Sequence, residues 1–227
     1  LAGTLLGMLL ASVNQTLAAT ALPTIVDELG GIEHYSWVFS AYVLGATVTI
    51  PLYGKLSDLY GRRPLFLGAI ALFSAGSIVA GLAPSMDLLV AGRAIQGLGA
   101  GGLIPLGVAV IGDIMAPRER GKWQAVNGVV FAASAVGGPM LGGWIADNAS
   151  WRLAFFVSLP LAALALVVVW FGFGRWGKRE ARRIDYLGAA LLTLGTGAGL
   201  VAAAAGGVDY AWGSPVIVSL LAASALL

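Results

Sequence analysis

A few polar side chains that could take part in chemistry interrupt long apolar stretches of this chain. Asn14 and Gln15 lie in one such stretch, and Arg93 and Gln96 lie in another. A charge in hydrocarbon surroundings is costly, so an arginine there marks by default a transport pathway or a pairing site. The alternative is that Arg93 extends to the outer headgroups. We take these four residues as candidate coupling and cavity residues.

The depth of these residues supports a shared site. At 1.5 Å per helical residue, Asn14 lies about 16 Å and the Arg93 backbone about 9 Å below the expected outer ends of their helices. The long Arg93 side chain brings its guanidinium toward the depth of Asn14. The helix of Arg93 is also rich in glycine, which favours contact with neighbouring helices over lipid. These glycines are Gly92, Gly97, Gly99, Gly101 and Gly102.

A second polar group lies between two apolar runs, in Pro51-Leu-Tyr-Gly-Lys-Leu-Ser-Asp-Leu-Tyr-Gly-Arg-Arg-Pro64. We expect residues 54–64 to form a hairpin. Asp58 stands four residues before Arg62, a spacing that allows a local ion pair. Glycines at two positions permit close approach or left-handed backbone geometry. The residues that define this pattern are Gly54, Asp58, Gly61, Arg62 and Arg63.

Composition sets the class of protein. Hydrophobic residues make up 59% of the 227 residues and charged residues 11%, against roughly a quarter charged in a soluble domain. Stretches of about 20 apolar residues can cross a bilayer as helices. The sequence therefore predicts an all-α integral membrane protein with a lipid bilayer as its surroundings. Spans are expected at about 1–22, 36–53, 65–83, 88–112, 123–145, 153–173 and 187–205, with a truncated eighth from 214.

Basic residues orient these spans. Placing the 55–64 loop in the cytoplasm also places 113–122 and 174–185 there, and these three segments contain eleven of the 13 lysines and arginines. The positive-inside rule favours this topology. Among the basic residues only Arg152 falls in an outer loop, and Trp151 beside it is expected to be an interfacial anchor.

An internal repeat is visible in inverted orientation. Helix 2 ends Pro51-x-x-Gly54-x-x-x-Asp58-x-x-x-Arg62, and helix 5 ends more loosely, Pro139-x-x-Gly142-x-x-x-x-Asp147-x-x-x-x-Arg152. The two versions fall on opposite faces of the membrane. Helices 1–3 and 4–6 are therefore interpreted as two inverted copies of a three-helix unit, as in many secondary transporters.

Helix 5 also contains a cluster that favours bending and close helix crossing. Proline removes one backbone hydrogen bond, and glycines let helices approach each other. The alternative is a structural kink with no link to transport direction. The cluster consists of Gly137, Gly138, Pro139, Gly142 and Gly143.

Together these motifs resemble the major facilitator superfamily, and in particular the N-terminal half of the fourteen-helix drug:proton antiporters. The segment from Gly54 to Arg63 resembles its loop between helices 2 and 3, which implies a cytoplasmic charge latch that holds the outward-open state. Arg93-Ala-Ile-Gln-Gly97-Leu-Gly99 resembles its helix 4 motif, whose arginine is tied to proton coupling. The helix 5 cluster resembles the antiporter motif associated with export.

Helix 1 departs from the family pattern. Val13-Asn-Gln-Thr-Leu-Ala-Ala-Thr-Ala-Leu-Pro23 resembles the family motif, except that Asn14 stands where the family has Asp. Asn cannot titrate. An engineered mimic of a protonated acid, a natural variant coupled elsewhere, and a transporter not driven by protons remain open. Asp113 is expected to pair with Arg118 or Arg120 rather than to carry protons.

The resemblance implies a domain organisation: a six-helix transporter domain over 1–173 with a 3+3 inverted repeat, a basic cytoplasmic linker over 174–185, and inserted helices over 186–227. It also implies a multi-pass protein of the cell (inner or plasma) membrane, with the C-terminal half of the same transporter as a partner. The front of the chain looks trimmed.

The expected function is proton-coupled efflux of small amphipathic organic compounds by alternating access, with an apolar cavity that favours hydrophobic or cationic cargo. The alternatives are an exporter of a specific lipid, siderophore or metabolite, and a non-transporting scaffold or receptor. The chain has no cysteine, and no metal-ligand spacing, nucleotide motif or catalytic triad is recognised. No cofactor beyond the proton gradient, no metal, no enzymatic activity and no nucleic-acid partner is therefore expected.

Overall fold

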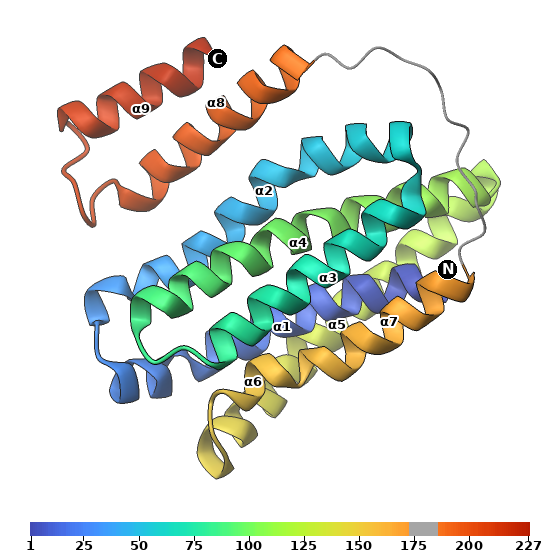
Figure 1. Ribbon diagram of the computed structural model, residues 1–227, viewed down its shortest axis with the longest axis horizontal. Coiled ribbons are helices and arrows are strands. Elements are labelled where there is room, and N and C mark those ends of the chain that lie inside the picture. Colours follow the sequence, from blue (N-terminus) through green and yellow to red (C-terminus); the bar gives the residue numbers. More distant parts are fainter. Residues whose placement is uncertain (173–185) are drawn as a thin grey trace.

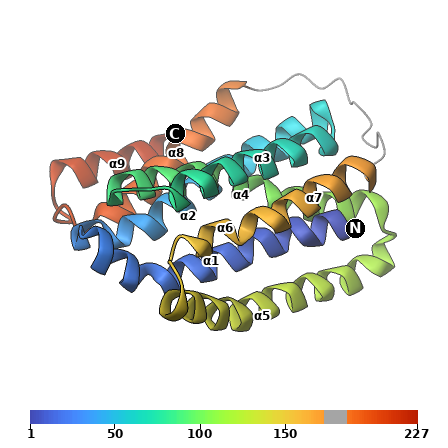
Figure 2. The same ribbon diagram turned by 60° about the horizontal axis from the view of Figure 1, so that its bottom comes forward.

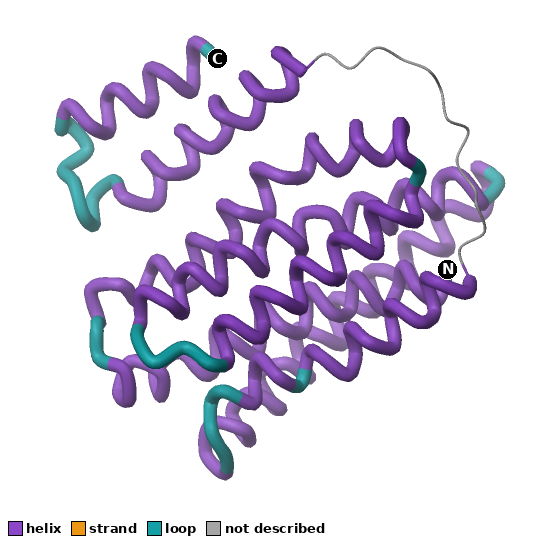
Figure 3. The backbone as a smooth tube through the Cα atoms, viewed as in Figure 1, coloured by secondary structure: helices purple, strands orange, loops and turns teal. Residues whose placement is uncertain are grey.

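A computed structural model describes residues 1–172 and 186–227 of the protein, and nearly all of them lie in helices joined by short loops (Figures 1 and 3). Hydrogen bonds within each helix satisfy the backbone, which is what a bilayer requires. The elements are α1 (Ala2–Leu29), the 3₁₀ helix η1 (Ile32–His34), α2 (Tyr35–Tyr60), α3 (Arg62–Gly81), α4 (Met86–Ile114), α5 (Pro117–Asn148), α6 (Leu153–Phe156), α7 (Ser158–Gly172), α8 (Tyr186–Ala205) and α9 (Pro215–Leu226).

Within the described residues, six helical segments are long and apolar enough to cross a membrane. They correspond to the first six predicted spans, with η1 continuing into α2 and with α6 and α7 together forming the sixth. Several helices are longer than predicted. α1 continues through Pro23 to Leu29, and α5 begins at Pro117, before its predicted start, and ends at Asn148. The apolar helices α8 and α9 lie at the positions predicted for spans seven and eight.

The predicted hairpin over residues 54–64 is wrong in extent. α2 continues to Tyr60 and α3 begins at Arg62, so one residue, Gly61, separates the two helices. Gly61 has a φ of 91°, which an L side chain rarely adopts, and this conformation reverses the chain in a single step. Gly54 is instead helical, and no described atom lies within 4 Å of the position that a Cβ would take there.

The packing of the first six spans agrees with the inverted repeat. α1 packs along α5 and α7, while α4 packs along α2 and α3. If spans 1–3 are matched to spans 4–6, these two sets of contacts correspond to each other. Figure 2 shows α5 on the far side of α1 from α2, α3 and α4, so α1 lies in the middle of the bundle. α4 is also central, because it packs against α1, α2 and α3. Both central helices are largely buried.

Glycine permits the close approach of α4 to its neighbours. A Cβ at Gly97 would stand 2.9 Å from the carbonyl carbon of Tyr42 in α2, and one at Gly99 would stand 2.8 Å from the Cα of Phe73 in α3. Real side chains do not approach backbone this closely, so these positions exclude any larger residue without a shift of the helices. The prediction that these glycines face helices rather than lipid is confirmed at both positions.

The hairpin of α8 and α9 lies against α2, at the edge of the bundle (Figure 1). Trp37 of α2 donates a hydrogen bond from Nε1 to Asp209 Oδ2, at 2.9 Å, and packs against a small apolar cluster of Ala202, Ala205 and Ile217. The hairpin is therefore attached to the bundle near one end of α2. The predicted linker over 174–185 lies outside the described residues.

Candidate functional site

Arg93 lies inside the helical bundle and not at its lipid surface. Its side chain extends from the central helix α4, and the residue is 1% exposed. Nη1 donates to Asn14 Oδ1 of α1 at 3.0 Å and to Gln96 Oε1 at 2.6 Å, while Nε donates to the carbonyl of Val38 at 3.2 Å. The alternative in which Arg93 extends to the headgroups is therefore wrong, and the predicted meeting of Asn14, Arg93 and Gln96 is confirmed in geometry.

The ring of Tyr42 packs against the guanidinium of Arg93. The guanidinium carbon lies 4.2 Å from the ring centroid, close enough for a cation–π interaction. The Tyr42 hydroxyl donates to the carbonyl of Ala11 at 3.2 Å, which fixes the ring between α1 and α4. Sequence analysis missed this residue because an isolated tyrosine in an apolar span carries no pattern of its own.

Two serines extend the polar network away from Arg93. Gln96 Nε2 donates to Ser77 Oγ of α3 at 2.7 Å, and Ser158 Oγ of α7 lies 3.1 Å from Ser77 Oγ. Four spans therefore meet through one connected set of buried groups, which we call the Arg93 network. Its members are Asn14, Ser77, Arg93, Gln96 and Ser158. The two serines were missed because small hydroxyl residues are common in membrane helices.

Gln15 does not join the Arg93 network. It is half-buried, and no hydrogen bond joins it to another described side chain. Asn14 is 1% exposed, and its Nδ2 has no hydrogen-bond partner among the described residues. The two neighbouring amides therefore differ, because adjacent residues on a helix point in directions about 100° apart.

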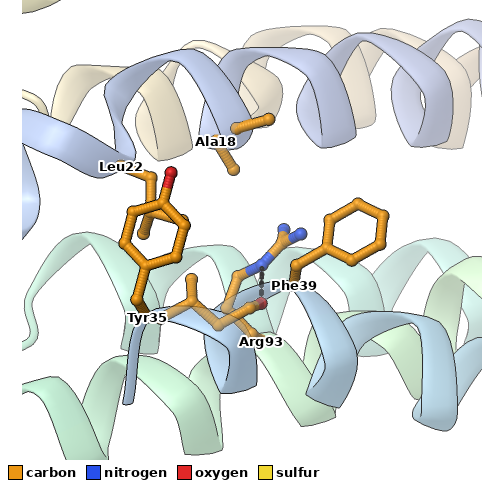
Figure 4. A pocket seen from close by; sticks show the side chains of 7 residues that line it. Ala18, Leu22, Tyr35, Phe39 and Arg93 are labelled. Atoms are coloured by element: carbon orange, nitrogen blue, oxygen red, sulfur yellow. Dashed lines mark hydrogen bonds between the residues drawn. The ribbon is translucent and has the colours of Figure 1, made fainter. Parts of the chain in front are cut away.

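A small pocket lies beside Arg93, between the outer halves of α1 and α2. Its volume is about 160 Å³, and its lining is apolar and aromatic apart from the Arg93 side chain. Figure 4 shows the guanidinium between the rings of Tyr35 and Phe39, directed toward Ala18 of α1. Small-molecule sites usually combine an apolar concave lining with a few polar or charged groups, and this pocket has both.

A second cluster lies at the end of the bundle that the basic residues assign to the cytoplasm. Arg62 Nη1 lies 2.8 Å from Asp58 Oδ1, which confirms the predicted ion pair, and Nη1 also contacts the Ser57 hydroxyl. Arg62 Nε donates to Asp113 Oδ2 of α4 at 3.1 Å. We call Ser57, Asp58, Arg62 and Asp113 the inner cluster. Arg63 lies apart from it, with its guanidinium carbon 4.8 Å from the Trp170 ring centroid.

The expected pairing of Asp113 with Arg118 or Arg120 is wrong. Asp113 binds Arg62, because the packing of α3 along α4 brings the start of one helix to the end of the other. Arg120, in the first turn of α5, instead donates to the carbonyls of Gly112 and Met115 at 2.7 and 3.3 Å. These carbonyls belong to the last turn of α4, where a cation compensates unpaired acceptors.

The opposite end of the bundle has a corresponding cluster. Arg152 Nη1 lies 2.5 Å from Glu28 Oε1 at the end of α1, and Trp151 Nε1 donates to Glu28 Oε2 at 2.7 Å. In the inverted repeat Arg152 matches Arg62 and Glu28 matches Asp113, so each repeat has an arginine paired with an acid near the end of a central helix. Trp151 is 1% exposed, so its predicted role as an interfacial anchor is wrong.

The helix 5 cluster faces α1 at two of its positions. Gly138 contacts Thr16, and a Cβ at Gly142 would stand 3.0 Å from Thr20 Cβ. Near them, the hydroxyls of Ser12 and Ser134 lie 2.7 Å apart. Gly137 and Gly143 face no described atom within 4 Å. α5 is continuous through Pro139, and the bending of this helix during transport stays a prediction.

Known proteins share both this fold and this sequence pattern. The sequence model of the Major Facilitator Superfamily matches residues 4–185. The chain belongs to this superfamily. Its members are transporters and not enzymes, and the six membrane-capable helices make this chain part of a multi-pass membrane protein.

Curated relatives include transporters and efflux proteins. The chain is 40% identical over 220 residues to the uncharacterized MFS-type transporter Rv1877 of Mycobacterium tuberculosis (strain ATCC 25618 / H37Rv), covering 97% of this chain and 32% of that protein. It is 37% identical over 218 residues to multidrug resistance protein 3 of Bacillus subtilis (strain 168), covering 96% and 43%. The chain thus spans about a third to two fifths of the length of these relatives.

The fold also matches solved transporter structures. The human organic anion transporter MFSD10 (TETRAN) superposes with a TM-score of 0.72 at 23% identity, over 96% of this chain and 58% of that one. The partially occluded, inward-open xylose transporter XylE from E. coli gives a TM-score of 0.69 at 17% identity, over 76% and 47%. At these identities the likeness concerns the fold alone.

Proposed function

We propose that this chain is the N-terminal part of a secondary transporter that exports amphipathic organic compounds in exchange for protons by alternating access. The observation that carries the proposal is the position of Arg93. A fully buried guanidinium that joins α1, α2 and α4 inside a membrane bundle is costly, and such a residue marks by default a site of transport or coupling. Relatives named for multidrug resistance support efflux as the direction.

The inner cluster supports the alternating-access part of the proposal. Arg62 is held by carboxylates from two helices, and these carboxylates are more than half exposed, at 64% for Asp58 and 54% for Asp113. Exposed ion pairs contribute little net free energy. Such a cluster is therefore suited to form in one transporter state and to open in another. Its expected partner is the second half of the same transporter.

A second candidate is the export of one specific lipid, siderophore or metabolite. The pocket of about 160 Å³ favours it, because sites for drug-sized ligands usually enclose about 300–1,000 Å³. A second half of the transporter would enlarge the cavity, so drug-sized compounds could also fit. Both candidates require transport. A scaffold or receptor would require none.

Transport measured in liposomes tests the proposal. The full-length transporter that contains this chain is reconstituted, a pH gradient is imposed, and the movement of fluorescent amphipathic compounds is followed. We expect gradient-driven accumulation that an uncoupler abolishes. Exchange of a single compound class would favour the specific exporter. Absence of exchange for every compound, with correctly inserted protein, would contradict transport.

A further inference from the structure

We propose that the pocket beside Arg93 binds the carboxylate of an anionic amphipathic substrate. This inference rests on the proposed transport function and names its substrate class. The first observation behind it is the positive charge of Arg93. Within the described chain no carboxylate pairs with Arg93, and its hydrogen-bond acceptors are two side-chain amides and one backbone carbonyl. The site therefore keeps a full positive charge in a buried position.

The positions of the acidic residues explain why Arg93 has no carboxylate partner. The described Asp and Glu residues lie at helix ends or in loops, as Glu28, Asp58, Asp113 and Asp147 do, and none lies in the middle of a span. Burial of an uncompensated charge is expensive. The ring of Tyr42 compensates part of that cost. A bound anion would supply the missing counter-charge.

Unused hydrogen-bond donors point to the same ligand chemistry. Arg93 uses three of its five N–H groups, one on Nε and two on Nη1, and Nη2 has no acceptor among the described residues. Asn14 Nδ2 is buried and has no partner in the described chain. Groups of this kind are rare in native structures and call for a specific explanation. A carboxylate provides acceptors only, in a geometry that a guanidinium recognises.

The shape of the pocket indicates the rest of the ligand. Arg93 is the only charged residue in its lining, and Tyr35 and Phe39 present aromatic rings on either side of the guanidinium (Figure 4). Apolar lining residues from α1, Ala18 and Leu22, complete the surface. A ligand with a carboxylate and an apolar or aromatic body would satisfy both parts. The charge thus argues against the cationic cargo that composition alone favoured.

Three naphthalene compounds that differ in charge test this inference: 2-naphthoate, 2-naphthamide and 2-naphthylmethylammonium. Binding to the full-length transporter is measured by titration calorimetry, and efflux is measured from liposomes. We expect 2-naphthoate to bind about tenfold or more tightly than the amide, since a hydrogen bond to a charged group contributes that much. The cation should bind most weakly.

Variants test whether the preference for 2-naphthoate arises at the pocket beside Arg93. Asn14→Asp places a carboxylate beside Arg93 and should remove the preference for 2-naphthoate. Gln15→Leu, at the neighbouring residue outside the Arg93 network, should keep it. Arg93→Gln should also remove the preference, and it provides a second reading if the Asp variant does not fold. Retention of the preference in Asn14→Asp and in Arg93→Gln would overturn the inference.

Two other results would overturn it. Equal affinity for the three compounds would show that the charge of Arg93 is compensated elsewhere, and transport of all three would then leave the proposed function standing. Displacement of 2-naphthoate by millimolar chloride would assign the site to a small inorganic anion. Gradient-driven movement of none of the compounds would instead contradict the transport proposal itself.

Discussion

Arg93 and Arg62 are both arginines with several hydrogen-bond partners, but they differ in burial and in the charge of those partners. Arg93 is 1% exposed and bound by neutral acceptors, whereas the Arg62 side chain is 18% exposed and bound by two carboxylates. The arginine of the inner cluster is compensated by carboxylates and lies close to water, so its ion pairs can break and re-form at little cost. The Arg93 network is buried and positively charged, so its hydrogen bonds are costly to break. One site is suited to a conformational latch and the other to binding a counter-charge.

The first way to test this comparison is to remove the buried charge. Arg93→Ala should abolish transport while the protein still inserts, because the change removes the hydrogen bonds that join α4 to α1 and α2. Efflux from liposomes and the amount of protein in the membrane measure the two effects. Arg93→Lys, which keeps the charge but not the planar donor geometry, should retain partial activity. Normal efflux in the alanine variant would contradict a role for Arg93 in transport.

The second test makes the Arg93 network resemble the inner cluster. Asn14→Asp in the full-length protein should make efflux more strongly dependent on the proton gradient than in the parent, since a carboxylate in this buried position can exchange protons and an amide cannot. The measurement is the loss of efflux on addition of an uncoupler, compared between the parent and the variant. Asn14→Leu is the matched neutral control. Unchanged sensitivity to the uncoupler would exclude position 14 from coupling.

The third test compares two glycines on α4, one near each site. Gly97→Ala should destabilise the protein by about 1–3 kcal/mol, because the new methyl group meets the backbone at Tyr42. Gly112→Ala, toward the inner cluster, should be neutral or slightly stabilising, since no described atom lies within 4 Å of its Cβ position. Thermal unfolding in detergent measures both. Equal melting temperatures would contradict the close packing of α2 and α4.

A smaller loss of stability than that of Gly97→Ala is expected at the inner cluster. Asp113→Asn should lower stability by about 0.2–1 kcal/mol, the usual range for an exposed ion pair. High salt should reduce the difference between parent and variant, because salt screens exposed charges. Thermal unfolding at low and high salt gives both values. A loss comparable to that of Gly97→Ala would show that the inner cluster is structural and not a weak latch.

Local patterns in the sequence were sufficient for much of the fold. The apolar runs predicted the spans, and the four-residue spacing of Asp58 and Arg62 predicted their ion pair, because both features depend on residues close together in the chain. Helix ends were predicted less well. The hairpin between α2 and α3 was expected to be long, since Gly and Pro suggested a loop, but one glycine with positive φ was enough to reverse the chain.

The sequence by itself determined that the protein is a membrane helix bundle with one arginine inside a span, since hydropathy and helix length need no knowledge of neighbours. Only the tertiary structure decided which groups meet that arginine. It linked Gln96 to Ser77 and Ser158, left Gln15 outside the network, and gave Asp113 to Arg62 in place of Arg118 or Arg120. The physical reason is that such contacts depend on helix rotation and on the close approach permitted by glycine. Both are set by packing between segments far apart in the chain.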